Sequence, residues 1–135
     1  LRLGDLLQER GHYEAALMEY AKATAADGKG SPLLSTRIAV AQLALGDRNG
    51  ALKTTEASLS EYPNMAETHR VRGQILRALG RVQEAADAYR ESVSIYPFNE
   101  DCQKALSELY EQLGNSTLAA RHKRYLTILR RGGEG

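Results

Sequence analysis

The sequence predicts an all-α fold, a right-handed superhelical stack of four helix–turn–helix repeats. Three observations predict it: a glycine recurs at near-constant spacing, a helical pattern of apolar residues lies on each side of it, and no strand pattern occurs. The glycines are Gly11, Gly46, Gly80 and Gly114, at intervals of 35, 34 and 34 residues. A period in the low thirties is typical of proteins whose repeats bury their apolar faces against their neighbours.

Two helical patterns in each period give eight expected helices in a single domain of residues 1–135. We expect them at about 1–10, 13–26, 32–45, 48–61, 65–79, 82–95, 99–113 and 116–130. The repeats should then cover about 1–30, 31–64, 65–98 and 99–131, and we expect the first to be truncated at its N-terminus. Each glycine should end a helix, because glycine readily takes the positive φ found just past a helix C-terminus.

Local signals support these boundaries. The first helix of the third period carries an apolar stripe, formed by Val71, Ile75, Leu76 and Leu79. Pro97 should stop the second helix of that period, since proline lacks the amide donor and clashes with the preceding turn. Asn64 with Glu67 is typical of a capping box, and Ser31 followed by Pro32 should open the helix at 32–45.

Small and aromatic residues recur in phase with the glycines. The third period carries Gly73, Leu79-Gly80, Ala85, Tyr89 and Pro97. The second carries Ala39, Leu45-Gly46, Ala51 and Pro63, with Thr55 in place of the aromatic residue. The first keeps Gly4, Gly11, Ala16 and Tyr20, and the fourth keeps Tyr110, Gly114 and Ala119 but has Lys123 and Leu126 at the later aromatic and small positions. This pattern resembles the tetratricopeptide repeat, a helix–turn–helix unit of 34 residues.

Steric reasons explain the small residues. Two antiparallel helices approach to about 8–10 Å only where small side chains lie at the crossing. We expect these crossings to pair Gly4 with Ala16, Ala39 with Ala51, and Gly73 with Ala85. An aromatic ring such as that of Tyr89 should fill the wedge toward the next repeat.

Composition and motifs argue against catalysis. The net charge is +1, from 18 basic and 17 acidic side chains, so no overall field attracts nucleic acid or a membrane. The single cysteine, Cys102, excludes an internal disulfide, and its neighbours Glu100 and Asp101 should raise rather than lower its pKa. The three histidines lie in different repeats without metal-ligand spacing. We expect no enzyme activity, no catalytic residue, no metal and no cofactor.

The resemblance implies a protein–protein interaction module that binds a peptide segment or domain edge in a concave groove lined by the first helix of each repeat. The residues implied are Asp5, Gln8, Glu9, Thr36, Val40, Leu43, Arg70, Gln74, Arg77, Lys104, Glu108 and Glu111. Arg70, Arg77 and Lys104 should form a basic strip. The alternative is that the arginines pair with Glu67, Glu108 or Glu111 and add about 0–1 kcal/mol each. Relatives that grip chaperone tails use a lysine/asparagine clamp in the groove. Leu1 and Asp5, or Thr36 and Val40, occupy the places of its first pair here, which makes that function unfavoured.

The C-terminal segment concentrates positive charge and could also mediate contacts. Its basic residues are Arg121, Lys123, Arg124, Arg130 and Arg131, which either are solvated or meet an anionic partner. Tyr125, Leu126 and Leu129 form a candidate end-on contact for a second copy of the chain or another domain.

Two further functions stay open: an accessory or scaffolding domain of a larger enzyme, and self-assembly through the superhelix ends. The expected partner is another protein or peptide, not nucleic acid, and no segment should insert into a membrane. The sequence leaves the compartment open, with the cytoplasm slightly favoured for a soluble chain.

Overall fold

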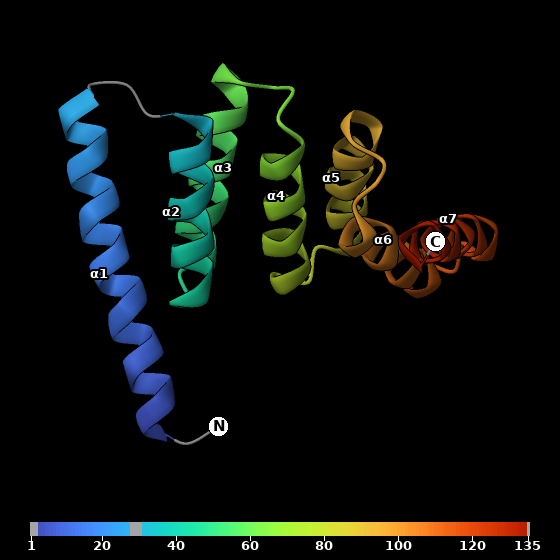
Figure 1. Cartoon of the computed structure of the whole chain (residues 1–135), viewed down its shortest axis with the longest axis horizontal. Helices are drawn as coiled ribbons and strands as arrows, with labels where there is room; N and C mark the ends of the chain where they lie inside the picture. The colour runs from blue at the N-terminus through green and yellow to red at the C-terminus, as the bar shows by residue number, and fades with distance from the viewer. Residues whose placement is uncertain (1–2, 28–30, 135) are drawn as a thin grey trace. The chain divides into compact units, whose positions relative to one another are not determined.

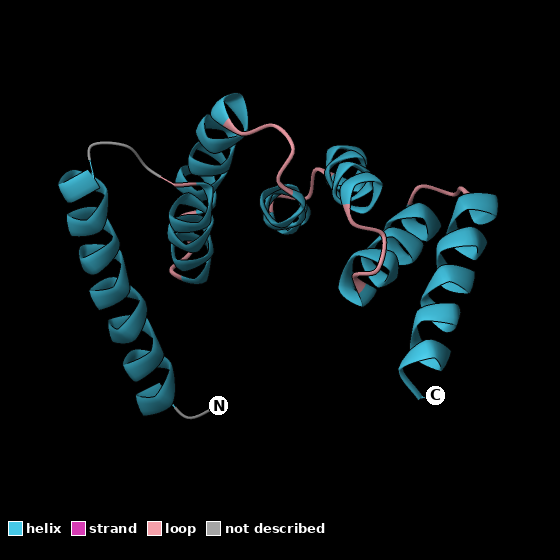
Figure 2. Cartoon of the chain, turned by 45° about the horizontal axis from the view of Figure 1, so that its top comes forward, coloured by secondary structure: helices cyan, strands magenta, loops and turns pink. Residues whose placement is uncertain are grey.

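The computed structural model describes residues 3–27 and 31–134, with the side chains of residues 9–25 and 31–132. Every regular element in these ranges is a helix, as the colouring of Figure 2 shows. The elements, labelled in Figure 1, are α1 (Leu3–Asp27), α2 (Pro32–Ala44), α3 (Arg48–Glu61), α4 (Ala66–Ala78), α5 (Val82–Ile95), α6 (Glu100–Gln112) and α7 (Ser116–Glu134). The predicted all-α fold of stacked helix hairpins is confirmed.

The chain divides into two compact units, Leu1–Pro63 and Asn64–Gly135. In the first unit α2 packs against α1 and α3. In the second unit α4 packs on α5, α5 on α6, and α6 on α7. The apolar stripe of α4 provides part of the second unit's core, because Val71, Ile75 and Leu76 are fully buried, as are Leu106 and Leu109 of α6.

Three of the four recurring glycines end a helix as predicted. Gly46, Gly80 and Gly114 have φ of 87°, 77° and 76°, a conformation that costs a residue with a Cβ about 1–2 kcal/mol. Each of the three turns has the same backbone hydrogen bonds. In the second unit's first turn, for example, the Gly80 amide donates to the Arg77 carbonyl at 3.0 Å, and the Arg81 amide donates to the Leu76 carbonyl at 2.9 Å.

The prediction of a helix pair at 1–10 and 13–26 is wrong, because α1 runs without a break from Leu3 to Asp27. Gly11 lies inside it, does not have a positive φ, and has open space where a Cβ would stand. An interior glycine costs a helix only about 0.5–1 kcal/mol, which is not enough to end it without a packed return helix. The expected crossing of Gly4 with Ala16 therefore cannot form, since both residues belong to one helix.

Side-chain caps fix most of the other helix starts. The Ser31 hydroxyl accepts from the Leu34 amide at 3.1 Å, and Pro32 takes the first helical position, both as predicted. Asp47 caps α3 through the Gly50 amide at 3.0 Å. The prediction of a capping box that begins at Asn64 is wrong, because the N-cap residue of α4 is Met65 and no side chain caps this helix.

The small residues of the two predicted crossings beyond the first repeat are buried, and Gly73 also has an aromatic neighbour. Ala39, Ala51 and Ala85 are all fully buried. The atoms nearest to a Cβ on Gly73 would belong to the ring of Tyr89, at 2.8 Å for both Cδ2 and Cε2. Gly73 is therefore needed because the ring of Tyr89 lies directly on the backbone of α4.

Candidate partner-binding surfaces

The predicted groove residues of the second unit lie on α4 and α6, and we call the surface that carries them the α4–α6 face. The Arg77 guanidinium on α4 donates to the Glu108 carboxylate on α6 at 2.9 Å, and both side chains are about two-fifths exposed. This bond links one side chain of α4 to one side chain of α6. Gln74 is half-buried one turn before Arg77.

Most charges of this strip have partners within the chain. Arg70 forms two hydrogen bonds with Glu67, one turn earlier on α4, and this pairing is the main cause that raises the pKa of Arg70. Glu111 accepts from Lys123 of α7 at 3.1 Å. Lys104 is exposed and forms no ion pair with the described residues. Arg70 and Arg77 are therefore both paired with glutamates, which was the alternative to a free basic strip.

The predicted groove residues of the first unit differ in their exposure. Thr36 is buried, and its hydroxyl donates to the Pro32 carbonyl at 2.7 Å. Val40 and Glu9 are exposed and Leu43 is half-buried. The side chains of Asp5 and Gln8 lie outside those that the structure describes.

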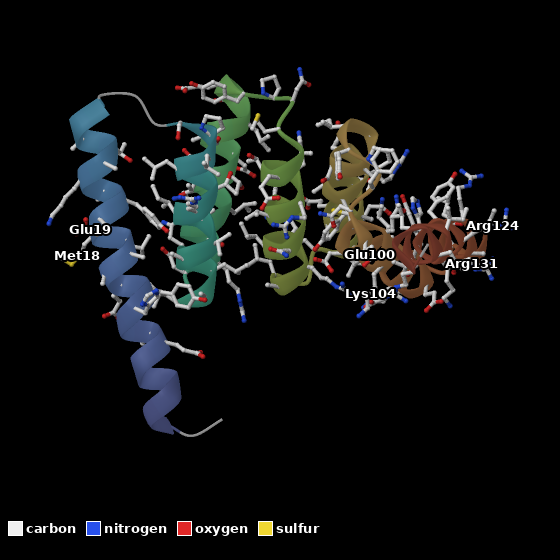
Figure 3. All side chains as sticks on the ribbon, viewed as in Figure 1. Met18, Glu19, Glu100, Lys104, Arg124 and Arg131 are labelled. Atoms are coloured by element: carbon white, nitrogen blue, oxygen red, sulfur yellow. The ribbon has the colours of Figure 1, made fainter. Side chains whose placement is uncertain are left out.

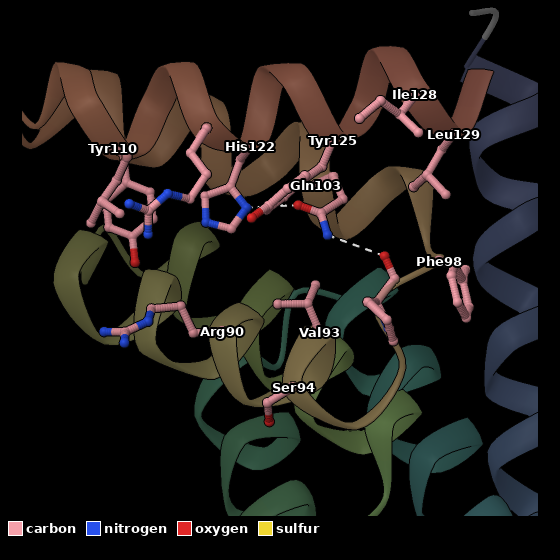
Figure 4. A pocket seen from close by; sticks show the side chains of 13 residues that line it. Arg90, Val93, Ser94, Phe98, Gln103, Tyr110, His122, Tyr125, Ile128 and Leu129 are labelled. Atoms are coloured by element: carbon pink, nitrogen blue, oxygen red, sulfur yellow. Dashed lines mark hydrogen bonds between the residues drawn. The ribbon is translucent and has the colours of Figure 1, made fainter. Parts of the chain in front are cut away.

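A groove that the sequence analysis did not predict lies between α5 and α7, with residues of α6 at its base (Figure 4). Its volume is about 590 Å³. The lining residues are Arg90, Val93, Ser94, Pro97, Phe98, Gln103, Tyr110, Leu118, Arg121, His122, Tyr125, Ile128 and Leu129. Two of the predicted end-contact residues, Tyr125 and Leu129, line this groove. The third, Leu126, is buried.

A polar network fixes the base of this α5–α7 groove. The Gln103 amide nitrogen donates to the Pro97 carbonyl at 3.1 Å, which turns Oε1 toward Nδ1 of His122 at 2.6 Å. Because Oε1 can only accept, Nδ1 carries the proton and donates. The His122 ring stacks on Tyr110, with centroids 5.6 Å apart. Burial lowers the pKa of His122, and the nearby Arg121 and Arg90 lower it further.

The single cysteine of the sequence, Cys102, is buried in α6. The pKa of Cys102 is raised, as predicted, but the main cause is burial rather than the acidic neighbours. Its Sγ lies 3.6 Å from the Ser92 hydroxyl. No cluster of three His, Cys, Asp or Glu residues suited to a metal ion occurs among the described residues.

The basic side chains near the C-terminus project from α7. Figure 3 shows Arg124 and Arg131 extending away from this helix. Of the described helices, none is both long and apolar enough to cross a bilayer.

Comparison with known proteins agrees with the repeat pattern and the hairpin geometry. Residues 36–100 match the family model described as Tetratricopeptide repeat. Residues 36–100 belong to the tetratricopeptide-repeat family. Small glutamine-rich tetratricopeptide repeat-containing protein 2 of Mycosarcoma maydis is 30% identical over 105 residues, which cover 78% of this chain and 30% of that protein. The chain thus spans less than a third of the length of this relative.

Solved structures agree on the fold. A crystal structure of MamA superposes with a TM-score of 0.80 over 98% of this chain and 77% of that chain, at 18% identity. MamA from Desulfovibrio magneticus RS-1, residues 41 to the end, gives a TM-score of 0.80 at 19% identity over 96% of this chain and 72% of that chain. The family and fold together make the chain a protein–protein interaction module in general terms.

Proposed function

We propose that this tetratricopeptide-repeat chain binds a peptide segment or domain edge of another protein across the α4–α6 face. The observation that supports the proposal is the Arg77–Glu108 bond between α4 and α6, with Gln74 one turn before Arg77 and Lys104 one turn before Glu108. A partner segment lying along this surface would meet side chains from both helices at once.

The internal ion pairs do not prevent such binding. Exposed pairs are worth about 0–1 kcal/mol, so a carboxylate of the partner can replace Glu108 beside Arg77 at little cost. Lys104 adds a cation without a described partner. These features favour a segment that carries at least one carboxylate, with Gln74 available to bond its backbone.

The test uses an array of synthetic peptides of graded net charge, probed with the purified chain. For the tightest binder we expect Lys104→Glu and Gln74→Ala to weaken binding about fivefold or more, in line with the loss of ~1 kcal/mol. Arg124→Glu is the matched control, because Arg124 is an exposed cation on α7 away from this face. Equal affinities for Lys104→Glu and wild type would exclude the α4–α6 face as the binding surface.

A further inference from the structure

We propose that the α5–α7 groove is a second docking surface and that its occupant is an acidic amphipathic helix of another protein. The groove has two chemically different ends. Figure 4 shows Tyr110 and Arg90 toward one end, and Phe98 and Leu129 at the other. The occupant should therefore present apolar side chains to one end and an anionic side chain to the other.

The apolar end is exposed to an unusual degree for side chains of this kind. Phe98 and Ile128 are 63% and 58% exposed, and Tyr125 is 44% exposed. These three side chains come from the α5–α6 loop and from α7 and line one continuous cavity. Covering apolar surface yields about 25 cal/mol per Å², so an occupant with apolar anchors gains affinity here.

Charge complementarity selects an acidic occupant. Two guanidinium groups, Arg90 and Arg121, line the groove, and no carboxylate is among its lining residues in the described part of the chain. Neither arginine forms an ion pair with any described residue, unlike Arg70 and Arg77. Asp87 lies one turn before Arg90 and acts on Tyr110 as well, but it does not line the groove. A carboxylate that enters the groove would meet two guanidinium groups, one from α5 and one from α7.

The hydroxyl of Tyr110 provides a second, independent indication. Tyr110 is buried, and its Oη atom has no hydrogen-bond partner among the described residues. Leaving such a group unsatisfied costs about 1–3 kcal/mol. Arg90 is close enough to Tyr110 to lower its pKa against the raising effect of burial. An acceptor oxygen on the occupant, placed beside Arg90, would satisfy this hydroxyl.

The walls of the groove favour a helix over an extended strand. Both walls are α-helices whose backbone groups are bonded internally, and the Pro97 carbonyl between them is taken by Gln103. A strand would find no free backbone edge to pair with. Recognition must therefore use side chains, as when an amphipathic helix lays its apolar face into a groove.

The test selects occupants from a display library of amphipathic helices of about 16 residues, with Leu anchors at i, i+3, i+4 and i+7 and flanking positions randomised between Glu and Lys. We expect the selected helices to be enriched in Glu beside the anchors. Enrichment in Lys, or no binder that the groove variants below weaken, would overturn the proposal.

Matched variants then locate the binding site of the tightest selected helix. Arg121→Glu and Ile128→Ser should each weaken it about tenfold or more, which corresponds to ~1.4 kcal/mol. The controls Arg124→Glu on α7 and Ile95→Ser on α5 should leave its affinity unchanged, because neither residue lines the groove. All of these side chains are exposed, so the variants should fold.

Two further measurements separate helix docking in this groove from binding at the α4–α6 face and from self-association. Arg77→Glu should leave helix binding unchanged, since Arg77 lies on the α4–α6 face; a loss would assign the helix to that face and overturn the proposal. Sedimentation of the chain alone should give a monomer. A dimer that Ile128→Ser abolishes would identify a second copy as the occupant and overturn the proposed partner.

Discussion

In the α2–α3 hairpin the small residue of the first helix is Ala39, and Thr55 stands 16 residues later, whereas the α4–α5 hairpin has Gly73 and Tyr89 at the same two places. Thr55 is fully buried and its hydroxyl donates to the Leu52 carbonyl at 2.8 Å. The ring of Tyr89 instead lies on the backbone at Gly73, and burial raises the pKa of Tyr89 to about 12.

The difference shows that the residues at these two positions depend on each other's size, because they share one space between the helices. Removing one methyl group from the first helix makes room for a ring from the second, while the turn between the helices stays the same. Gly46 and Gly80 both have a positive φ and the same hydrogen bonds. The repeat period is therefore set by the turns, and each hairpin adjusts its own packing within that period.

The largest expected effect comes from replacing Gly73 and Tyr89 of the α4–α5 hairpin by alanine and threonine, the residues at the same two places of the α2–α3 hairpin. Tyr89→Thr should cost about 3 kcal/mol, since it removes a buried ring. Gly73→Ala alone should cost ~1–3 kcal/mol, because its Cβ would stand 2.8 Å from the ring. In the double variant the clash disappears with the ring, so the total should be clearly less than the sum of the single costs.

Chemical denaturation of the four proteins measures this coupling. The matched control is Ala39→Gly in α2, which has no ring to accommodate and should destabilise by about 1 kcal/mol. Additive costs for Gly73→Ala and Tyr89→Thr would show that the two residues do not share one space, and the comparison between the hairpins would fail.

Much of this fold was predictable because glycine and proline act locally. The six helices from residue 32 onward lie where the sequence placed them, and α7 alone extends further, to Glu134. The continuity of α1 through Gly11 was not predictable from the residue alone, because a glycine ends a helix only when the following segment packs back on the preceding one. Gly11 has no neighbour in its Cβ direction to indicate such packing.

The surfaces were predictable only in part, for a similar reason. Helix periodicity placed Arg77 and Glu108 on the first helices of adjacent repeats and allowed their pairing as the alternative to a free basic strip; the structure has the pair. The α5–α7 groove depends on the distance between α5 and α7, the second helices of the last two repeats. That distance is decided by the volumes of side chains from α5, α6 and α7, which the sequence pattern does not give. The apolar side chains of Tyr125 and Ile128 were the available signal, and the predicted end contact includes only the first of them.

An intermediate effect should separate the turn glycines from Gly11. Gly80→Ala should destabilise by about 1–2 kcal/mol, because alanine must then adopt a φ near 77°. Gly11→Ala should instead stabilise α1 by ~0.5–1 kcal/mol, since alanine favours a helix interior and open space receives its methyl group. Thermal unfolding of the two variants checks the opposite signs. A destabilising Gly11→Ala would contradict a continuous α1 and favour the helix break that the repeat pattern predicts.

The smallest expected effect is a loss of stability in mild acid that arises from the second unit. Burial, with Arg121 and Arg90 beside the ring, lowers the pKa of His122 below its ordinary 6.5. The unfolded chain therefore takes up a proton before the folded chain does, so the contribution of His122 is fully present above pH 6.5 and is lost as the pH falls through the lowered pKa. Protonation keeps the Nδ1–H bond to Gln103 but puts a third positive charge beside the two arginines.

Unfolding measured in denaturant from pH 7.5 to 5 should show this decline in wild type, and His122→Gln should flatten it. His12→Gln, at an exposed position of α1, should retain the decline. If His122→Gln declines as steeply as wild type, another group titrates in this range and the buried network at the base of the groove is not its cause.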